Sequence, residues 1–447
     1  MPALCSALML VTLLTWMLAG VAFFFDLWRI PILLIIGVVG TFTAQSVRSD
    51  HFYNLRPRSP DRAPTAAETI KAAKSARVVV AAANGGGIQA GAWAAQVLYG
   101  LQQDCGEAFR RSLRMISSVS GGSVGNAMYV HSLANPVGTQ RPDKAAAASS
   151  IDEVAWGLGW PDFLRALFPW LFGFLIPVGR GRALEKAWSM NSVSGASSRS
   201  DLDQPLSGWN RKVAEGEIPA VVMNATISET GERLLLATTE FGAQSPAGRA
   251  RVDARELHRV NGVDFDVSVA TAARLSASFP YVTPAARSDG PGPQPHVVDG
   301  GYYDNYGMAT MVEWLDEALT GAAGAVNNVL VLQIHGAPVD ANPKEKRHEA
   351  THGWFYQAIA PLATLGAVRT AGQLAHNEIE LELLRQKWAA SGVTIDSVTF
   401  EFSNPNAPLS WHLTPQEIDA ISTEWNGPKM APSRKRVKNF LTAAAGA

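Results

Sequence analysis

The chain has 447 residues, enough to bury a large core in one α/β domain with an appendage or in two smaller domains. Its 38 Lys and Arg nearly balance 39 Asp and Glu, so no overall charge favours a nucleic acid or another polyanion as partner. The two cysteines, Cys5 and Cys105, lack the spacing of a metal site or a disulfide framework, which fits a reducing compartment. We therefore expect one large domain with an appendage and no nucleic-acid partner.

The amino-terminal segment is apolar over a length that fits a membrane. No charged residue occurs from Ala3 to Phe25, and a helix of this length measures about 35 Å, against roughly 30 Å for a hydrocarbon core. A cleaved signal peptide is the alternative, but the charged start is missing and the apolar part is too long. We interpret the segment as a transmembrane helix. A second run, Ile30 to Ala44, is shorter, and we expect a tilted second span, a re-entrant piece or a helix on the membrane surface.

The basic residues predict how this anchor is oriented. None precedes the first run, only Arg29 lies between the runs, and four arginines follow the second. These are Arg48, Arg56, Arg58 and Arg62. By the positive-inside rule the two runs form a hairpin and the bulk of the chain stays in the cytoplasm; if only the first run spans, the start of the chain lies outside. We expect a membrane anchor over residues 1–47, a proline-containing linker over 48–75, and the lipid bilayer as a partner.

Short apolar runs then alternate with helix-like runs. The predicted strands are Val78–Ala83, Leu113–Ile116, Ala220–Asn224, Arg233–Thr238, Val329–Ile334 and Val398–Phe402. The predicted helices are Ala90–Leu101, Val124–Leu133, Glu378–Trp388 and one that begins after Thr414 as its cap. This alternation predicts an α/β fold over residues 76–447, a three-layer α/β/α sandwich with a mostly parallel central sheet.

One stretch departs from this alternation. Trp160 to Val178 is dense in aromatic and aliphatic residues but is interrupted by Pro169, Gly173 and Pro177. Two interpretations stay open for this insertion, which we place around residues 155–190. It is either a buried helix pair, or a lid that dips into the bilayer and delivers a lipid chain to the site.

Three short motifs carry the chemistry. Ser120 lies between an apolar run and a helix-like run and is followed by two glycines, which suits a nucleophile at a tight strand-to-helix turn. A serine hydroxyl needs a base, and the nine histidines have no catalytic motif around them. Asp299, at a strand end before two glycines, suits that role. Gly85, Gly86 and Gly87 precede a helix, where backbone N–H groups can stabilise an oxyanion; a phosphate cradle or a plain turn is the alternative, and the P-loop ending is absent.

In this order the motifs resemble the patatin-like phospholipase family, whose hydrolases use a Ser-Asp dyad and a glycine-rich oxyanion loop. The quoted motifs are Gly85-Gly86-Gly87 with Gly91, Val119-Ser120-Gly121-Gly122-Ser123, and Asp299-Gly300-Gly301; between them Asn224-Ala225-Thr226, Glu229-Thr230-Gly231 and the block Ala272 to Pro284 are also similar. The resemblance covers roughly Arg77 to Gly307. It implies that Ser120 is the nucleophile and Asp299 the base, with Gly85, Gly86 and Gly87 as oxyanion donors. Ser123 is the nearest alternative serine.

Two residues depart from the family pattern. Ser118 occupies the first glycine position of the usual Gly-x-Ser-x-Gly, and Ile88-Gln89 stand where many relatives have an arginine. Serine is small enough for the turn, whereas the arginine contact is in doubt. The resemblance implies a membrane-anchored serine lipid acyl hydrolase acting on a membrane lipid substrate, with no metal or organic cofactor required. A non-catalytic lipid-binding scaffold and an acyltransferase on the same residues remain the alternatives.

Overall fold

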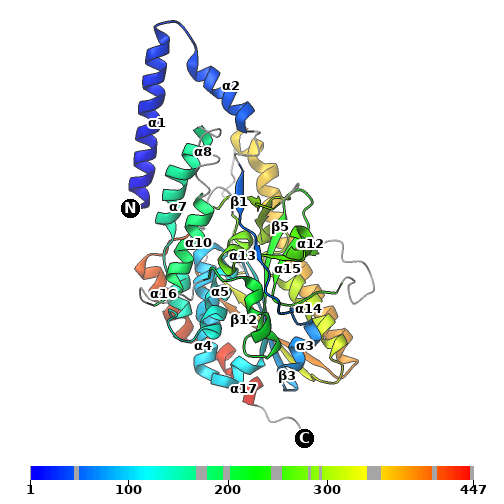
Figure 1. The fold of residues 1–447 in the computed structure, drawn as a ribbon. Coiled ribbons are helices and arrows are strands. Elements are labelled where there is room, and N and C mark those ends of the chain that lie inside the picture. The colour runs from blue at the N-terminus through cyan, green and yellow to red at the C-terminus, as the bar shows by residue number, and fades with distance from the viewer. Residues whose placement is uncertain are drawn as a thin grey trace.

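A computed structural model of the chain describes residues 2–44, 50–167, 179–194, 202–242, 254–279, 283–290, 294–339, 354–404 and 410–442. A ten-stranded sheet forms its centre, with strands paired in the order β1-β9-β10-β5-β4-β3-β11-β12, while β6 pairs with β5 and β7 (Figure 1). The strands are β1 (His51–Tyr53), β3 (Arg77–Ala83), β4 (Leu113–Val119), β5 (Ala220–Ile227), β6 (Arg233–Ala237), β7 (Ala254–Glu256), β9 (Ala286–Ser288), β10 (Val297–Asp299), β11 (Asn328–His335) and β12 (Thr394–Glu401).

The sheet is mostly parallel, as predicted. Strands β5, β4, β3, β11 and β12 run parallel to one another, and the antiparallel pairs are those of β5 with β6 and of β10 with β5 and β9. Every residue of β4 is buried, because a parallel sheet covered on both faces leaves no side of the strand in water. Burial on both faces explains why such a strand is apolar at successive positions in the sequence.

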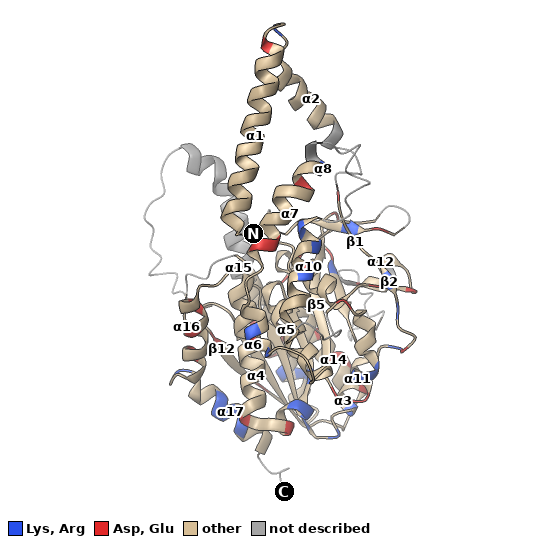
Figure 2. Ribbon diagram, turned by 60° about the vertical axis from the view of Figure 1, so that its left-hand side comes forward, with Lys and Arg blue, Asp and Glu red and all other residues tan. Residues whose placement is uncertain are grey.

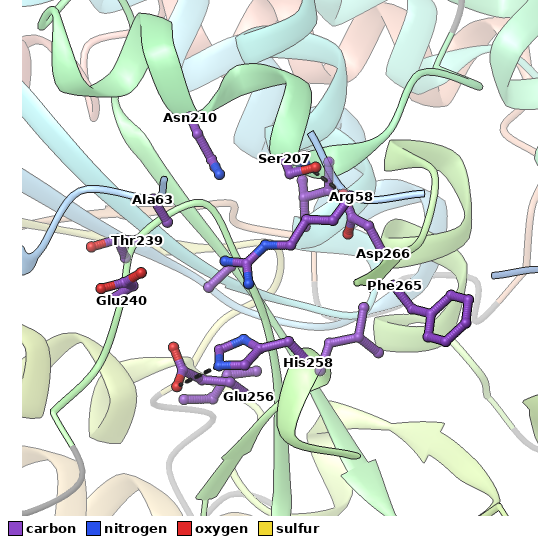
Figure 3. Close-up of a pocket in the computed structure, with 14 residues that line it drawn as sticks. Arg58, Ala63, Ser207, Asn210, Thr239, Glu240, Glu256, His258, Phe265 and Asp266 are labelled. Atoms are coloured by element: carbon purple, nitrogen blue, oxygen red, sulfur yellow. Dashed lines mark hydrogen bonds and ion pairs between the residues drawn. The ribbon is translucent and has the colours of Figure 1, made fainter. Parts of the chain in front are cut away.

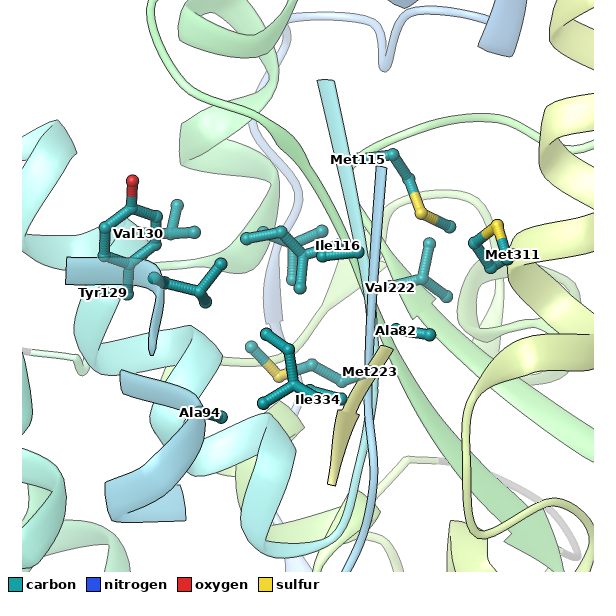
Figure 4. Packing of buried hydrophobic residues seen from close by; sticks show 14 of the residues in the cluster. Ala82, Ala94, Met115, Ile116, Tyr129, Val130, Val222, Met223, Met311 and Ile334 are labelled. Atoms are coloured by element: carbon teal, nitrogen blue, oxygen red, sulfur yellow. The ribbon is translucent and has the colours of Figure 1, made fainter. Parts of the chain in front are cut away.

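Helices cover both faces. One layer contains α4 (Gly87–Ser112), α5 (Gly121–Ala134), α13 (Val269–Ser276), α16 (Pro415–Asn426) and α17 (Ala431–Thr442); the other contains α3 (Ala66–Lys71), α14 (Met308–Gly321) and α15 (Trp354–Ala389). Figure 4 shows how successive residues of β4 serve the two layers: Ile116 points toward Val130 of α5, and Met115 points toward Met311 of α14. The three-layer sandwich expected from the sequence is confirmed.

The remaining elements lie around this core. They are α6 (Pro142–Ala147), α7 (Ile151–Gly157), a π-helix (Leu158–Asp162), α8 (Phe163–Leu167), α10 (Arg180–Asn191), a 3₁₀-helix (Leu206–Trp209), α11 (Asn210–Ala214), α12 (Leu257–Asn261), the 3₁₀-helix η4 (Gly300–Tyr302) and the strand pair β2 (Arg56–Pro57) with β8 (Phe265–Asp266). The insertion predicted from Trp160 to Val178 is therefore helical up to Leu167, and residues 168–178 lie outside the described part. Thr414 caps α16 in a capping box with Glu417, as predicted.

The segment expected to be a linker is part of the fold. His51–Tyr53 adds an edge strand beside β9, and Thr65 caps α3 in a capping box. Figure 3 shows Arg58 of this segment in a small pocket, opposite the ion pair of His258 with Glu256, whose nearest atoms are 3.6 Å apart. The prolines predicted a linker, but proline removes only one donor per residue, and other amides of the segment, such as those of Arg58 and Ser59, donate to the domain.

The amino-terminal helices form a hairpin that projects from the domain (Figure 1). It comprises α1 (Ala3–Asp26) and α2 (Ile32–Ala44), and α1 is long and apolar enough to cross a membrane, whereas the apolar part of α2 is shorter. Figure 2 shows that both helices are uncharged except near the tip that joins them. The start of α1 lies against the domain: the amide of Ala3 donates to Oδ1 of Asp152 at 2.7 Å, and Ser6 is buried.

Glycines let α4 and α5 approach each other within backbone contact. A Cβ on Gly125 would lie 2.2 Å from the carbonyl oxygen of Gly91, and one on Gly121 would lie 1.8 Å from that of Gly87. These four glycines recur every fourth residue on each helix, so they share one helix face. The crossing brings the start of α5, where Ser120 lies, against the start of α4, where the glycine loop ends.

We predict that Gly125→Ala costs at least about 2 kcal/mol of unfolding free energy, because the added methyl meets backbone that cannot move aside without separating the helices. Chemical denaturation of the detergent-solubilised protein measures this. Gly372→Ala is the matched control in a helix, where no described atom lies within 4 Å of the added carbon, and it should leave stability unchanged or raise it by up to about 1 kcal/mol. Equal stability of the two variants would contradict the packing account.

A buried histidine at the end of β11 makes the fold sensitive to acid. Burial lowers the pKa of His335 from its usual 6.5 to about 4, and its ring packs edge-on against Tyr306, with centroids 5.5 Å apart. Between these two pH values the unfolded chain binds a proton that the folded chain does not. The stability that the neutral ring of His335 contributes is therefore fully present above pH 6.5 and is lost as the pH falls toward 4.

For the wild-type protein we predict a loss from this residue of about 2 kcal/mol between pH 7.5 and pH 5. His335→Asn, which has no titrating ring, should flatten that part of the pH profile even if it lowers stability at every pH. Part of the slope remains, because burial and then Arg180, Arg165 and Arg274 lower the pKa of His51 to about 3. Denaturation midpoints at several pH values test this, and an unchanged slope would show that His335 is not the group responsible.

Candidate active site

Ser120 lies at a strained turn between β4 and α5. Its backbone has φ 52° and ψ −126°, a conformation that costs a residue with a Cβ about 1–3 kcal/mol. Two glycines allow the turn: a Cβ on Gly122 would lie 2.5 Å from the carbonyl oxygen of Asn84, and Gly121 meets Gly87 as described above. Strained backbone that the surrounding packing imposes is typical of a nucleophile turn.

Asp299 is brought close to Ser120 by a different strand, β10. Each strand has two edges, and β6 occupies one edge of β5 from Val222 to Thr226. On the other edge β4 pairs with residues up to Asn224, and β10 pairs with Ala225 to Ile227. Strands β4 and β10 therefore run toward each other along one edge and end at adjacent positions.

The register puts the two predicted residues at this meeting point. Val119, immediately before Ser120, pairs with Asn224, and Asp299 pairs with the next residue, Ala225. The chain after Asp299 passes so close to β4 that a Cβ on Gly300 would lie 3.2 Å from Cγ1 of Val119. The structure thus brings Ser120 and Asp299, which are far apart in sequence, to one end of the sheet. Both residues are buried.

A hydrogen-bonded turn sets the orientation of the carboxylate. Oδ1 of Asp299 accepts the amide of Gly301 at 2.8 Å, and the amide of Asp299 donates to the carbonyl oxygen of Ser278 at 3.2 Å. Amide donors favour the charged form of a carboxylate and restrict its rotation.

Asn305 joins this turn to the glycine loop. Its carbonyl oxygen accepts the amide of Gly85 at 2.9 Å. A Cβ on Gly85 would lie 2.3 Å from Oδ1 of Asn305 and 2.9 Å from Cβ of Ser120, so only glycine fits between these side chains. A Cβ on Gly301 would lie 2.7 Å from the same Asn305 oxygen. The three sequence motifs therefore meet around one asparagine side chain.

The glycine loop divides into two parts. The amide of Gly85 is engaged by Asn305, so this residue supplies space between Ser120 and Asn305 and not a donor. Gly86 and Gly87 have φ of 146° and 60°, which favour glycine, and Gly87 is the first residue of α4. Among the described residues no backbone acceptor lies in hydrogen-bond range of their two amides, as usual in the first turn of a helix.

Ser276 links the nucleophile turn to β5. Its hydroxyl donates to the carbonyl oxygen of Asn224 at 2.6 Å and accepts the amide of Ser120 at 3.1 Å. Ser123, the alternative serine of the sequence, lies behind this group, with its hydroxyl 2.8 Å from that of Ser276 and 3.1 Å from that of Ser118. Ser123 is fully buried in a polar network, which makes it a structural residue.

Two further positions concern the departures from the family pattern. Ser118 in the first glycine position is accommodated: its hydroxyl accepts from Nδ2 of Asn126 at 3.0 Å and donates to the carbonyl oxygen of Val222 at 3.3 Å. Gln89, where relatives have arginine, turns away from Ser120, and its Nε2 donates to the carbonyl oxygen of Gly336 at 2.7 Å. Its side chain thus joins α4 to the end of β11.

Sequence reasoning did not identify the supporting residues. Ser276 and Asn224 lie within the blocks that resemble the family, but nothing around them indicates a role, since serine and asparagine are common in turns. Asn305 follows Asp299 at a distance of six residues and becomes informative only when the chain around Gly301 is seen to fold back.

Comparison with known proteins agrees with the motifs. The sequence profile described as Patatin-like phospholipase matches residues 83–312, and no curated protein matches the chain. Among solved structures, human GIVD cytosolic phospholipase A2 is 13% identical with a TM-score of 0.33, covering 60% of this chain and 46% of that chain. VipD from Legionella pneumophila is 11% identical with a TM-score of 0.31, covering 89% of this chain and 72% of that chain.

The chain therefore spans about half the length of the human phospholipase. The profile match, in contrast, includes more than half of the 447 residues and contains Gly85, Ser120 and Asp299 together with strands β4 and β10. On this match, the chain belongs to the patatin-like phospholipase family.

Proposed function

We propose that the protein is a membrane-anchored serine lipid acyl hydrolase that cleaves fatty-acyl esters of phospholipids or related lipids through Ser120 and Asp299. The observation that carries the proposal is the register on β5, where Val119 and Asp299 pair with adjacent residues. A strained turn at Ser120 and the glycine loop beside it support the same assignment.

In the proposed reaction Asp299 accepts the hydroxyl proton of Ser120 as its Oγ attacks the ester carbonyl carbon. The tetrahedral intermediate collapses, the C–O bond of the ester breaks, and the leaving alcohol takes the proton from Asp299. A water molecule then gives a proton to Asp299 and attacks the acyl-enzyme, which releases the fatty acid and returns the proton to Ser120. The same two residues serve both halves of the reaction.

The oxyanion of each intermediate would be stabilised by the amides of Gly86 and Gly87, with the positive end of the α4 dipole behind them. Gly85 takes the supporting role assigned to it above, because its amide already donates to Asn305. The loop needs no side chain for this role, which is consistent with Gln89 in place of an arginine.

We predict that Ser120→Ala abolishes hydrolysis of fatty-acyl esters and covalent labelling by a fluorophosphonate, while the unfolding midpoint stays close to that of the wild type. Removing one hydroxyl from a small residue changes little packing, and relief of backbone strain is minor since alanine keeps its Cβ. Rates and labelling are measured on purified full-length protein in detergent micelles.

Ser123→Ala is the matched control for this experiment. It removes a hydroxyl that is linked to the turn at Ser120 only through Ser276 and Ser118, so it should keep labelling while lowering stability by about 1 kcal/mol through the lost bonds to these two serines. Full activity of Ser120→Ala, or loss of labelling only in Ser123→Ala, would show that the nucleophile is assigned wrongly.

The membrane part of the proposal is supported by the exposed surface of α1. Trp16 and Phe23 are 80% and 85% exposed. A whole helix of exposed apolar side chains is unfavourable in water and favours a membrane or a partner surface. The part of α1 beyond the buried Ser6 is about 30 Å long, which matches a hydrocarbon core. At its far end Phe24 and Trp28 pack edge-on with centroids 4.7 Å apart, as expected for aromatic residues at an interface.

The docked start of α1 supports the hairpin and not the single span. Since Ala3 contacts Asp152 of α7, the amino terminus lies on the same side of the bilayer as the domain. α2 measures only about 20 Å, so it returns part of the way as a helix. Together with the arginines that follow, this supports the proposal that the catalytic domain faces the cytoplasm.

We predict that epitope tags at both termini are digested by protease in the same vesicle orientation, because both ends of the hairpin face the domain. The protein should resist extraction by salt and high pH and be released by detergent, and Leu13→Lys with Trp16→Lys should weaken this retention. Protection of one tag with digestion of the other would favour a single span and contradict the hairpin.

A further inference from the structure

Helix α15 contacts the turn that follows Asp299 through Gln373 and Asn377. Oε1 of Gln373 accepts the amide of Asn305 at 3.0 Å, and its Nε2 donates to the carbonyl oxygen of Tyr303 at 2.6 Å and to that of Gly301 at 3.4 Å. One helical turn later, Nδ2 of the buried Asn377 donates to Oδ1 of Asp304 at 3.1 Å. Both residues lie on the same face of α15 because they are four positions apart.

The turn has little regular structure of its own to hold it. Gly300–Tyr302 is a single 3₁₀ turn, in which the amides of Tyr303 and Asp304 both donate to the carbonyl oxygen of Gly300. Short 3₁₀ segments have poorer hydrogen-bond geometry than α-helix and are easily rearranged. Loss of the Gln373 amide would take partners from an N–H and from two carbonyl groups at once, and each group left without a partner destabilises the turn.

One further hydrogen bond links these contacts to Asp299 on one side and to the glycine loop on the other. Gly301, whose carbonyl Gln373 binds, donates its amide to Oδ1 of Asp299. Asn305, whose amide Gln373 binds, accepts the amide of Gly85 with its carbonyl oxygen. A single side chain therefore connects the turn that orients the base with the loop that approaches Ser120.

We propose that Gln373 is a positioning residue for the hydrolysis, acting through the turn of residues 300–305 to hold Asp299 in its position beside Ser120. The proposal rests on the function proposed above. It extends that function to a part of the chain beyond residues 83–312, which the family profile matches. The role requires a side chain that both donates and accepts, a property that glutamine has and that glutamate and methionine lack.

The first test is Gln373→Met, which keeps the length of the side chain and removes all three hydrogen bonds. We expect kcat to fall about 10- to 100-fold, because a displacement of about 1 Å at a reacting group has effects of this size, while KM stays within about threefold. The acidic limb of the kcat profile should move to higher pH, since the Gly301 amide that favours the charged carboxylate is less well held. A purely structural residue would lower stability without moving this limb.

The second test, Gln373→Glu, separates the acceptor contact of Gln373 from its two donor contacts. It keeps the acceptor for the Asn305 amide and loses both donors to the carbonyl groups, so it should lower kcat at least about fivefold if the Asp299 side of the turn is decisive. This variant also replaces Gln373→Met in the test if Gln373→Met does not fold. Gln386→Met is the matched control on the same helix, because Nε2 of Gln386 donates to Oε1 of exposed Glu382 at 3.0 Å, away from the turn; its kcat should equal that of the wild type.

All variants are assayed as full-length protein in detergent micelles, with a chromogenic fatty-acyl ester and with fluorophosphonate labelling. If Ser120→Ala is inactive and a folded Gln373→Met or Gln373→Glu keeps wild-type kcat and pH profile, the positioning role is overturned and the proposed function stands. If Ser120→Ala itself keeps activity, the proposed function fails first. A parallel fall of kcat and labelling rate in both Gln373 variants supports the inference.

Discussion

The arrangement depends on one constraint, the sharing of a single edge of β5 by two strands that run in opposite directions. β4 occupies the edge up to Asn224 and β10 occupies it from Ala225, so neither can be extended without displacing the other. Strand ends are where side chains and turns can leave the sheet plane. Two such ends at adjacent positions place Ser120 and the carboxylate of Asp299 together, and hydrogen bonds of the sheet hold the pair.

Close backbone approach is the second condition. The turn at Ser120 exists because Gly121 and Gly122 let α5 begin against Gly87 and Asn84. Any Cβ at these glycines would move Ser120 away from the loop that approaches it. The strain at Ser120 is thus maintained by packing that extends along both helices, and rigid scaffolding of this kind is what a preorganised site requires.

The part of the chain that follows the family motifs contacts the candidate site and the strands that support it. β11 pairs with β3 along its length, and α15 binds the turn after Asp299 through Gln373 and Asn377. At the other end of the chain, the start of α1 docks on α7 through Asp152, which ties the hairpin to the domain. These contacts fix the start of the apolar hairpin relative to the domain.

From the sequence alone the layers of the fold, the apolar amino-terminal helix and the order of the three motifs followed, because period, length and glycine placement are local properties. The helix Glu378–Trp388 was located but not its start at Trp354, since that half lacks a cap signal. Arg58 and its neighbours looked like a linker, yet their N–H groups and side chains find partners in the domain. Only the tertiary structure decided that β10 ends beside β4, that Asn305 takes the amide of Gly85, and that Gln373 supports the turn, because each of these contacts joins segments whose separation along the chain leaves no periodic trace.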